Sequence, residues 1–77
     1  MKTNKSIDPG SVIQIDPEIM GGTPCFKGTR VPIKNLFDFI EAGDPLREFL
    51  DAFPTVSQGQ AVAMLQLAEK SVIEMVA

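Results

Sequence analysis

Apolar residues in the second half of the chain recur every three or four positions, the spacing that places them on one face of an α-helix. This spacing predicts three helices, over about 33–42, 45–53 and 57–76. Pro32 suits the start of the first helix, whose first turn does not need its N–H, and Gly43 suits its end. Asp44 and Ser57 are placed to cap the second and third helices, and Pro54 stops the second.

The third predicted helix has more apolar residues than one face can hold. Its main stripe follows the helical spacing and consists of Ala61, Leu65, Ala68, Val72 and Met75. At about 100° per residue, Leu67 lies well outside this stripe, and Val62 and Ile73 lie on a further side. An isolated surface leucine is ordinary in any protein. In so small a domain, however, the surplus favours a dimer or partner surface that includes Val62, Leu67 and Ile73.

The first half of the chain has a different pattern, with short β-branched runs separated by glycine and proline. We interpret residues 1–11 as a flexible arm and expect strands near 12–15 and 25–31 in a β-hairpin. The predicted fold is mainly α, a trihelical, helix-turn-helix-like (homeodomain-like) bundle preceded by a short β-arm at 12–31. Residues 12–77 then form a single domain.

Length and cysteine content limit how this domain is stabilised. A chain of 77 residues buries a small core, and its single cysteine and lack of histidine leave neither a disulfide nor a good zinc site. Association, with itself or with another protein, is the remaining source of stability. We therefore expect a homodimer that binds no metal or cofactor.

The residue types of the chain do not favour a catalytic site. The chain has no His, Tyr or Trp, and Cys25 has no evident base beside it, so we interpret Cys25 as a small buried hydrophobe. No enzyme activity and no small-molecule substrate are expected. A lone cysteine suits a reducing compartment, and no stretch has the length of a membrane span or the form of a signal peptide, so we expect a cytoplasmic protein without a membrane partner.

Charge is distributed unevenly along the chain. The net charge is −3, but residues 1–34 contain five basic against three acidic residues, a net of +2. Residues 35–77 contain two basic against seven acidic residues, a net of −5. Any contact with phosphate should therefore come from the first half of the chain.

Two segments are candidates for DNA contact. The start of the third helix offers Ser57, Gln58 and Gln60, as the recognition helix of a helix-turn-helix does. The segment before the first helix is basic and offers Lys27, Thr29, Arg30 and Lys34, like the arms that some trihelical proteins lay in the minor groove. The alternative is structural, with Gly28 turning the chain, Thr29 capping or closing the turn, and Arg30 binding carbonyls or a carboxylate such as Asp38 or Glu41.

Several segments together resemble a known family. They are residues 16–24 (DPEIMGGTP), residues 28–33 (GTRVPI), Gly43, and the pair Phe53-Pro54. This pattern is similar to the domain-of-unknown-function family 433 and covers about residues 12–70. Relatives often have an aromatic residue near the position of Leu67, where this chain differs.

The resemblance implies a helix-turn-helix-like fold and an antitoxin-type role. Such a protein binds and neutralises a toxin resembling a PIN-domain ribonuclease, and binds its own operator DNA. The alternative, from a different class, is a stand-alone DNA-binding transcriptional regulator with no toxin partner.

Overall fold

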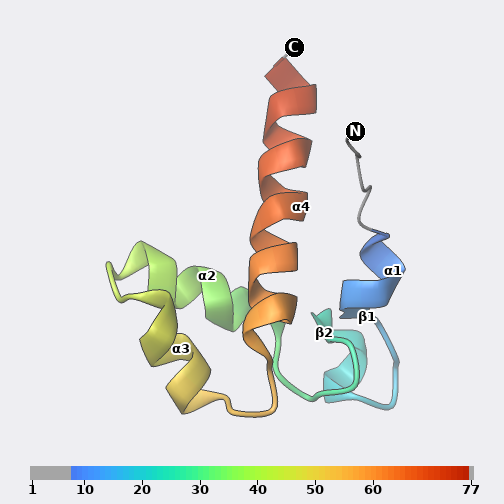
Figure 1. Cartoon of the computed structure of the whole chain (residues 1–77). Helices are drawn as coiled ribbons and strands as arrows, with labels where there is room; N and C mark the ends of the chain where they lie inside the picture. Colours follow the sequence, from blue (N-terminus) through green and yellow to red (C-terminus); the bar gives the residue numbers. More distant parts are fainter. Residues whose placement is uncertain (1–7, 77) are drawn as a thin grey trace.

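The fold is mainly helical, with a small two-stranded sheet near the N-terminus (Figure 1). The computed structural model describes residues 8–76. Its elements are α1 (Pro9–Val12), β1 (Ile13–Gln14), the 3-10 turn η1 (Met20–Gly22), β2 (Cys25–Phe26), α2 (Ile33–Glu41), α3 (Leu46–Ala52) and α4 (Gln58–Val76). The small helical bundle predicted from the sequence is thus confirmed, with one short helix in addition.

The additional helix, α1, lies within the segment that the sequence pattern predicted to be a flexible arm. That prediction is wrong for residues 9–11. Asp8 accepts a hydrogen bond from Gly10 N at 3.1 Å, Pro9 occupies the first turn, and the Ser11 hydroxyl donates to Asp8 O at 2.7 Å. The Asp-Pro-Gly sequence that suggested a turn therefore starts a helix, because the same residue types serve both structures. The rest of the predicted arm, residues 1–7, lies outside the described residues.

The predicted hairpin is present, but its strands are shorter than expected. β1 and β2 pair antiparallel, with Ile13 opposite Phe26 and Gln14 opposite Cys25. The second strand ends at Phe26 rather than continuing to Val31, because Gly28 has a φ of +79° and turns the chain. Cys25 is fully buried, as the sequence interpretation required, and its thiol donates to Thr23 O at 3.3 Å.

The three longer helices begin and end close to the predicted boundaries. Gly43 ends α2 with a φ of +83°, and the N–H groups of Gly43 and Asp44 donate to Ile40 O and Phe39 O in a Schellman motif. Asp44 was wrongly expected to cap α3, since the capping position belongs to Pro45 and has no side-chain hydrogen bond.

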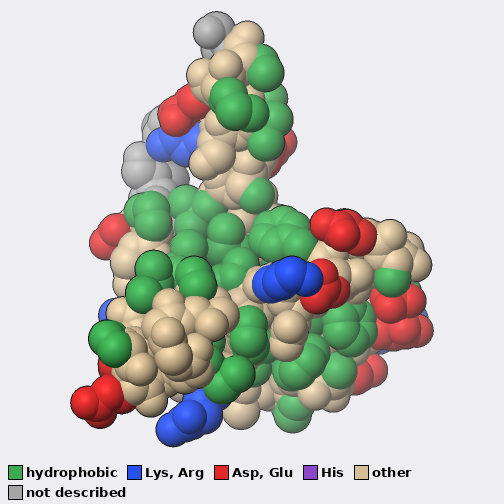
Figure 2. Space-filling model, turned by 180° about the vertical axis from the view of Figure 1, so that it is seen from behind, with side chains coloured by type: hydrophobic (Ala, Val, Ile, Leu, Met, Phe, Trp, Pro, Cys, Tyr) green, Lys and Arg blue, Asp and Glu red, His purple; other side chains and the backbone are tan. Residues whose placement is uncertain are grey.

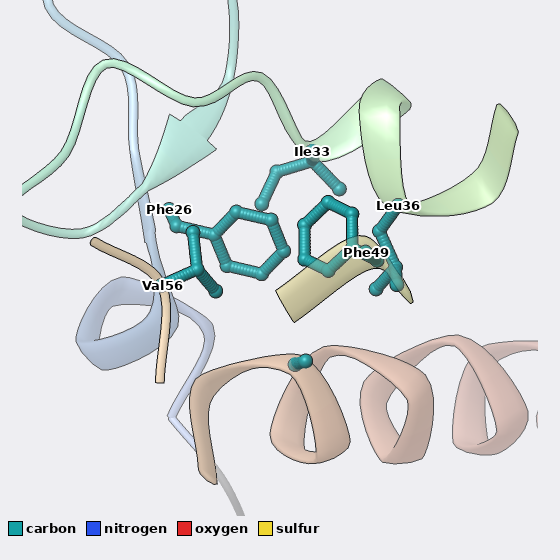
Figure 3. Close-up of a cluster of buried hydrophobic side chains, with 6 residues drawn as sticks. Phe26, Ile33, Leu36, Phe49 and Val56 are labelled. Atoms are coloured by element: carbon teal, nitrogen blue, oxygen red, sulfur yellow. The ribbon is translucent and has the colours of Figure 1, made fainter. Parts of the chain in front are cut away.

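The hydrophobic core is built around Phe49, which is fully buried on α3 (Figure 3). Its ring centroid lies 5.9 Å from that of Phe26, 5.6 Å from that of Phe39 and 5.2 Å from that of Phe53. Figure 3 shows the Phe26 and Phe49 rings side by side above the first turns of α4. The other buried members of this cluster are Ile33, Leu36, Val56 and Ala61.

Helix α4 is only partly covered by this core. Ala61 is fully buried and Leu65 packs against the core, but Val72 is 52% exposed and Met75 is 76% exposed. Figure 1 shows the C-terminal part of α4 extending beyond the body of the domain, and Figure 2 shows apolar side chains along this projection. The predicted stripe therefore faces the core only over its first half. Among residues 8–76, no helix has both the length and the apolar character that crossing a membrane requires.

Replacing Phe49 should test the central place of its ring. We expect Phe49→Ala to lower the free energy of unfolding by about 3–5 kcal/mol, because it leaves a cavity where β2, α2 and α3 meet. Urea denaturation followed by circular dichroism measures this loss. Ile15→Ala is the control, because Ile15 is 67% exposed and its truncation should change stability by less than about 0.5 kcal/mol. Equal effects of the two substitutions would contradict the central role of Phe49.

Candidate functional site

The basic segment before α2 forms a tight turn over residues 27–30, and side chains from distant parts of the chain hold it. The Gln14 side chain accepts from Gly28 N at 3.2 Å and donates to Thr29 O at 3.1 Å. From the start of α4, the Gln60 side-chain amide donates to Lys27 O at 2.9 Å. These hydrogen bonds attach the turn both to β1 and to α4, so its backbone is well fixed.

Thr29 has a structural part in this turn. It is buried, and its hydroxyl donates to Phe26 O at 2.9 Å and accepts from Val31 N at 3.0 Å. Of the two structural interpretations of Thr29, closing the turn is the one observed, since α2 has Pro32 at its capping position and no side-chain cap. The hydroxyl is thereby committed to closing the turn.

Gln60 is similarly committed. It forms a capping box with Ser57, in which Gln60 N donates to Ser57 Oγ at 3.0 Å and Ser57 N donates to Gln60 Oε1 at 3.0 Å. The amide nitrogen of the Gln60 side chain also donates a hydrogen bond to Lys27 O. Both polar atoms of the Gln60 side chain are therefore engaged within the fold, and the Ser57 hydroxyl serves as the predicted cap. Of the three residues predicted at the start of α4, Gln58 is exposed, and no side-chain hydrogen bond is formed by it within residues 8–76.

Arg30 lies on the surface of the turn. It is exposed, and within residues 8–76 its side chain forms neither a hydrogen bond nor an ion pair. The predicted alternative in which Arg30 binds Asp38 or Glu41 is therefore wrong for this structure. Arg30 borders a depression of about 530 Å³ together with Ile19 and Thr55.

The two lysines of the predicted basic surface differ. Lys27 is exposed on the turn, and its ammonium donates to Gly10 O at 3.4 Å, which leaves its charge unpaired by any carboxylate in the described part of the chain. Lys34 forms an ion pair with Asp38 at 2.8 Å on α2. The hydrogen bond and charge of Asp38 raise the pKa of Lys34 above its ordinary value. Lys27 and Arg30 therefore share the turn as the available cations, whereas the charge of Lys34 is matched by Asp38.

A second surface is an apolar groove between the N-terminal elements and α4. It has a volume of about 330 Å³, and Pro9 and Ile13 line one side while Met64, Leu67 and Ala68 line the other. Leu67, expected at a partner surface, is thus half-buried in a groove wall. Val62 is also half-buried, and Ile73 is 58% exposed. The structure does not bring these three predicted residues together on one surface.

Sequence reasoning missed two contributors to these surfaces. Gln14 was predicted only as part of a strand, and nothing local indicates that its amide spans the turn. Pro9 was assigned to the arm, yet it lines the groove. Gln14 and Pro9 each lie beside residues more than a dozen positions away in the sequence, and periodicity does not detect contacts of this range.

Comparison with known proteins identifies the family. A sequence model described as "Protein of unknown function (DUF433)" matches residues 13–68. The chain belongs to the DUF433 family. This confirms the resemblance seen in the sequence, and the match covers the hairpin, the 27–30 turn, α2, α3 and the first half of α4.

Two relatives extend the comparison of this DUF433 chain. It is 36% identical over 45 residues to the uncharacterized protein y4eO of Sinorhizobium fredii (strain NBRC 101917 / NGR234), covering 58% of this chain and 20% of the relative. The crystal structure of a DUF433 member protein from Anabaena variabilis ATCC 29413 is similar with a TM-score of 0.66 at 26% identity. That similarity covers 83% of this chain and 63% of the solved one. The chain thus spans about a fifth of one relative and under two thirds of the other.

The glycine of the turn gives a direct test of its backbone. Gly28 has a φ of +79°, and a Cβ added there would meet no atom within 4 Å. We expect Gly28→Ala to destabilise the protein by about 1–2 kcal/mol through backbone strain alone. The matched control is Gly59→Ala in the first turn of α4, which should stabilise by up to about 1 kcal/mol because alanine is the better helix former. Thermal and urea unfolding measure both, and effects of the same sign would contradict a requirement for glycine at position 28.

Proposed function

We propose that the chain is a non-catalytic, antitoxin-type protein that binds and neutralises a partner toxin resembling a PIN-domain ribonuclease. The observation that carries the proposal is the apolar groove between α1, β1 and α4, lined by Leu67. The groove is lined mainly by apolar side chains, and grooves of this kind receive apolar side chains of a partner protein. The family resemblance supplies the antitoxin role, and the groove supplies a surface for it.

The rim of the groove gives such a partner a polar boundary. Lys70 and Glu74 both line it and lie 3.9 Å apart as an exposed ion pair. An apolar centre with a charged rim is the usual anatomy of a protein–protein interface. In this proposal the toxin inserts apolar side chains between Pro9 and Leu67, and its polar groups meet the Lys70–Glu74 pair.

Operator binding is the second role in this proposal. It is supported by the fixed turn that presents Lys27 and Arg30 beside the start of α4, to which Gln60 connects it. Because the backbone of the turn is already held by hydrogen bonds, binding phosphate would order only the Lys27 and Arg30 side chains and not the turn itself. Gln58 lies at the first turn of α4 and is the residue available there to contact a base edge.

A stand-alone DNA-binding regulator is the alternative function, and the unpaired Arg30 favours it. The neighbouring open reading frame separates the two. A short gene with several spaced acidic residues, as a metal-dependent nuclease needs, supports the antitoxin. Co-expression with that gene product, followed by a pull-down, supports or rejects the complex directly.

Leu67 tests the groove. We expect Leu67→Glu to abolish capture of the toxin in the pull-down, because a carboxylate in the groove would be desolvated by the partner. Gln66→Glu is the control, because this substitution adds the same charge at the neighbouring position of α4, where Gln66 is exposed. Circular dichroism verifies that both variants are folded. Retained capture by Leu67→Glu, with the fold intact, would reject the groove as the toxin site.

Salt dependence tests the turn. Each phosphate contact contributes about 0.9 to the slope of log affinity against log salt, so Lys27 and Arg30 predict a slope of about −1.8 per chain on operator DNA. Arg30→Ala should reduce this slope by about 0.9 per chain and leave the melting temperature unchanged, since its side chain supports nothing in the fold. Lys70→Ala, about 18 Å along α4 from Gln58 at 1.5 Å per residue, is the control and should leave the slope unchanged. An unaltered slope in Arg30→Ala would exclude Arg30 from the interface.

A further inference from the structure

The apolar stripe of α4 has the spacing of a coiled-coil seam. Its members are separated by four, three, four and three residues: Ala61, Leu65, Ala68, Val72 and Met75. This alternation corresponds to the a and d positions of a heptad, which keep one continuous face toward a packing partner. The domain's own core occupies the first part of the seam, where Ala61 is fully buried. The second part, with Val72 52% and Met75 76% exposed, continues in the same line without a partner in the described structure.

The exposed part of the seam carries almost no charge. At about 100° per residue, Glu69 is the charged residue of α4 beside the stripe, and Lys70 and Glu74 lie on the opposite side of the helix. Lys70 and Glu74 also pair with each other at 3.9 Å. Val76, 73% exposed, widens the apolar face next to the stripe. The occupant that this surface fits is therefore another uncharged helical stripe.

We propose that this occupant is a second copy of the chain, so that the free ends of two α4 helices pack against each other as an antiparallel pair. The proposal concerns self-association and does not depend on the toxin or on DNA. The proposed contact uses residues after 68, the position at which the match to the DUF433 family ends.

The antiparallel direction follows from the position of the core. The body of the domain covers the N-terminal part of the seam, and the free part extends away from it (Figure 1). In a parallel pair, the N-terminal half of the second helix would have to occupy the space filled by Phe49 and its neighbours. In an antiparallel pair only the free ends overlap, and the two bodies lie at opposite ends.

Charge selects the register of this pair. Antiparallel helices place an a residue beside a d residue, so Val72 of one copy can lie beside Met75 of the other. In that register Glu69 of one copy lies beside Val76 of the other. Shifting the pair by one heptad toward the bodies would bring the two Glu69 carboxylates together, which costs free energy because like charges repel. The first register therefore combines apolar layers with no like-charge contact.

The size of the overlap determines how tight the pair is. Stable interfaces use about 20–30 residues from each partner, whereas the free end of α4 offers only a few. We therefore expect a weak, concentration-dependent monomer–dimer equilibrium.

Analytical ultracentrifugation of the full chain tests the proposal, over concentrations from about 10 μM to about 1 mM, a range that covers weak interfaces. The wild type should pass from the 8.4 kDa monomer toward twice that mass. Val72→Glu, on the seam, should weaken association at least tenfold. Ile73→Glu is the matched control, because Ile73 is similarly exposed at 58% and takes the same charge, but lies about 100° around the helix. Ile73→Glu should therefore associate like the wild type.

Three results would overturn the proposal: a wild type that remains monomeric over the whole range, equal weakening by both substitutions, or no weakening by Val72→Glu. Leu67→Glu should leave self-association unchanged, because Leu67 lies about 140° from Val72 around α4. Failure of the dimer and failure of the toxin site are in this way measured by different variants. Circular dichroism and denaturation verify that each variant retains the fold, which is expected because Val72 and Ile73 lie outside the core.

Discussion

The contacts of one phenylalanine ring connect the parts of this fold. Phe49 on α3 reaches Phe26 of β2, Phe39 of α2 and Phe53 beyond α3, with ring centroids 5.2–5.9 Å apart. Such tilted and edge-to-face pairs add to the free energy that apolar burial alone provides. Because the domain buries few large side chains, the position of the hairpin relative to α2 and α3 depends on this ring.

The same packing determines where the interaction surfaces lie. Once Phe26 is fixed in the core, the chain must turn directly after it, and the turn of residues 27–30 comes within reach of both Gln14 and Gln60. Thr29 faces inward and satisfies backbone groups, while Lys27 and Arg30 face solvent. The turn of residues 27–30 therefore contains two kinds of residue: Thr29 stabilises the turn, whereas Lys27 and Arg30 are available to a ligand.

Helix α4 contributes to each surface in turn. Its first residues hold the 27–30 turn, its middle forms one wall of the apolar groove, and its end projects beyond the body with Val72 and Met75 exposed. A helix of 19 residues is about 28 Å long at 1.5 Å per residue, longer than the contact that so small a core can make. The excess length is the physical origin of the uncovered seam.

Local chemistry was readable from the sequence by itself. Helical spacing, Ser57 as a helix cap and Gly43 as a helix end act over a few residues, and they predicted the three main helices. The same holds for Gly28, whose unusual backbone follows from a turn between a strand and a proline-led helix. Only the tertiary structure decided that the Gln60 side chain donates to Lys27 O, 33 positions away. It also decided that Arg30 has no carboxylate partner among the described residues, and that the apolar stripe of α4 continues past the part that the core covers. Periodicity specifies which face of a helix is apolar. How much of that face is buried depends on elements that are distant in sequence, and the packing around Phe49 determines where those elements lie.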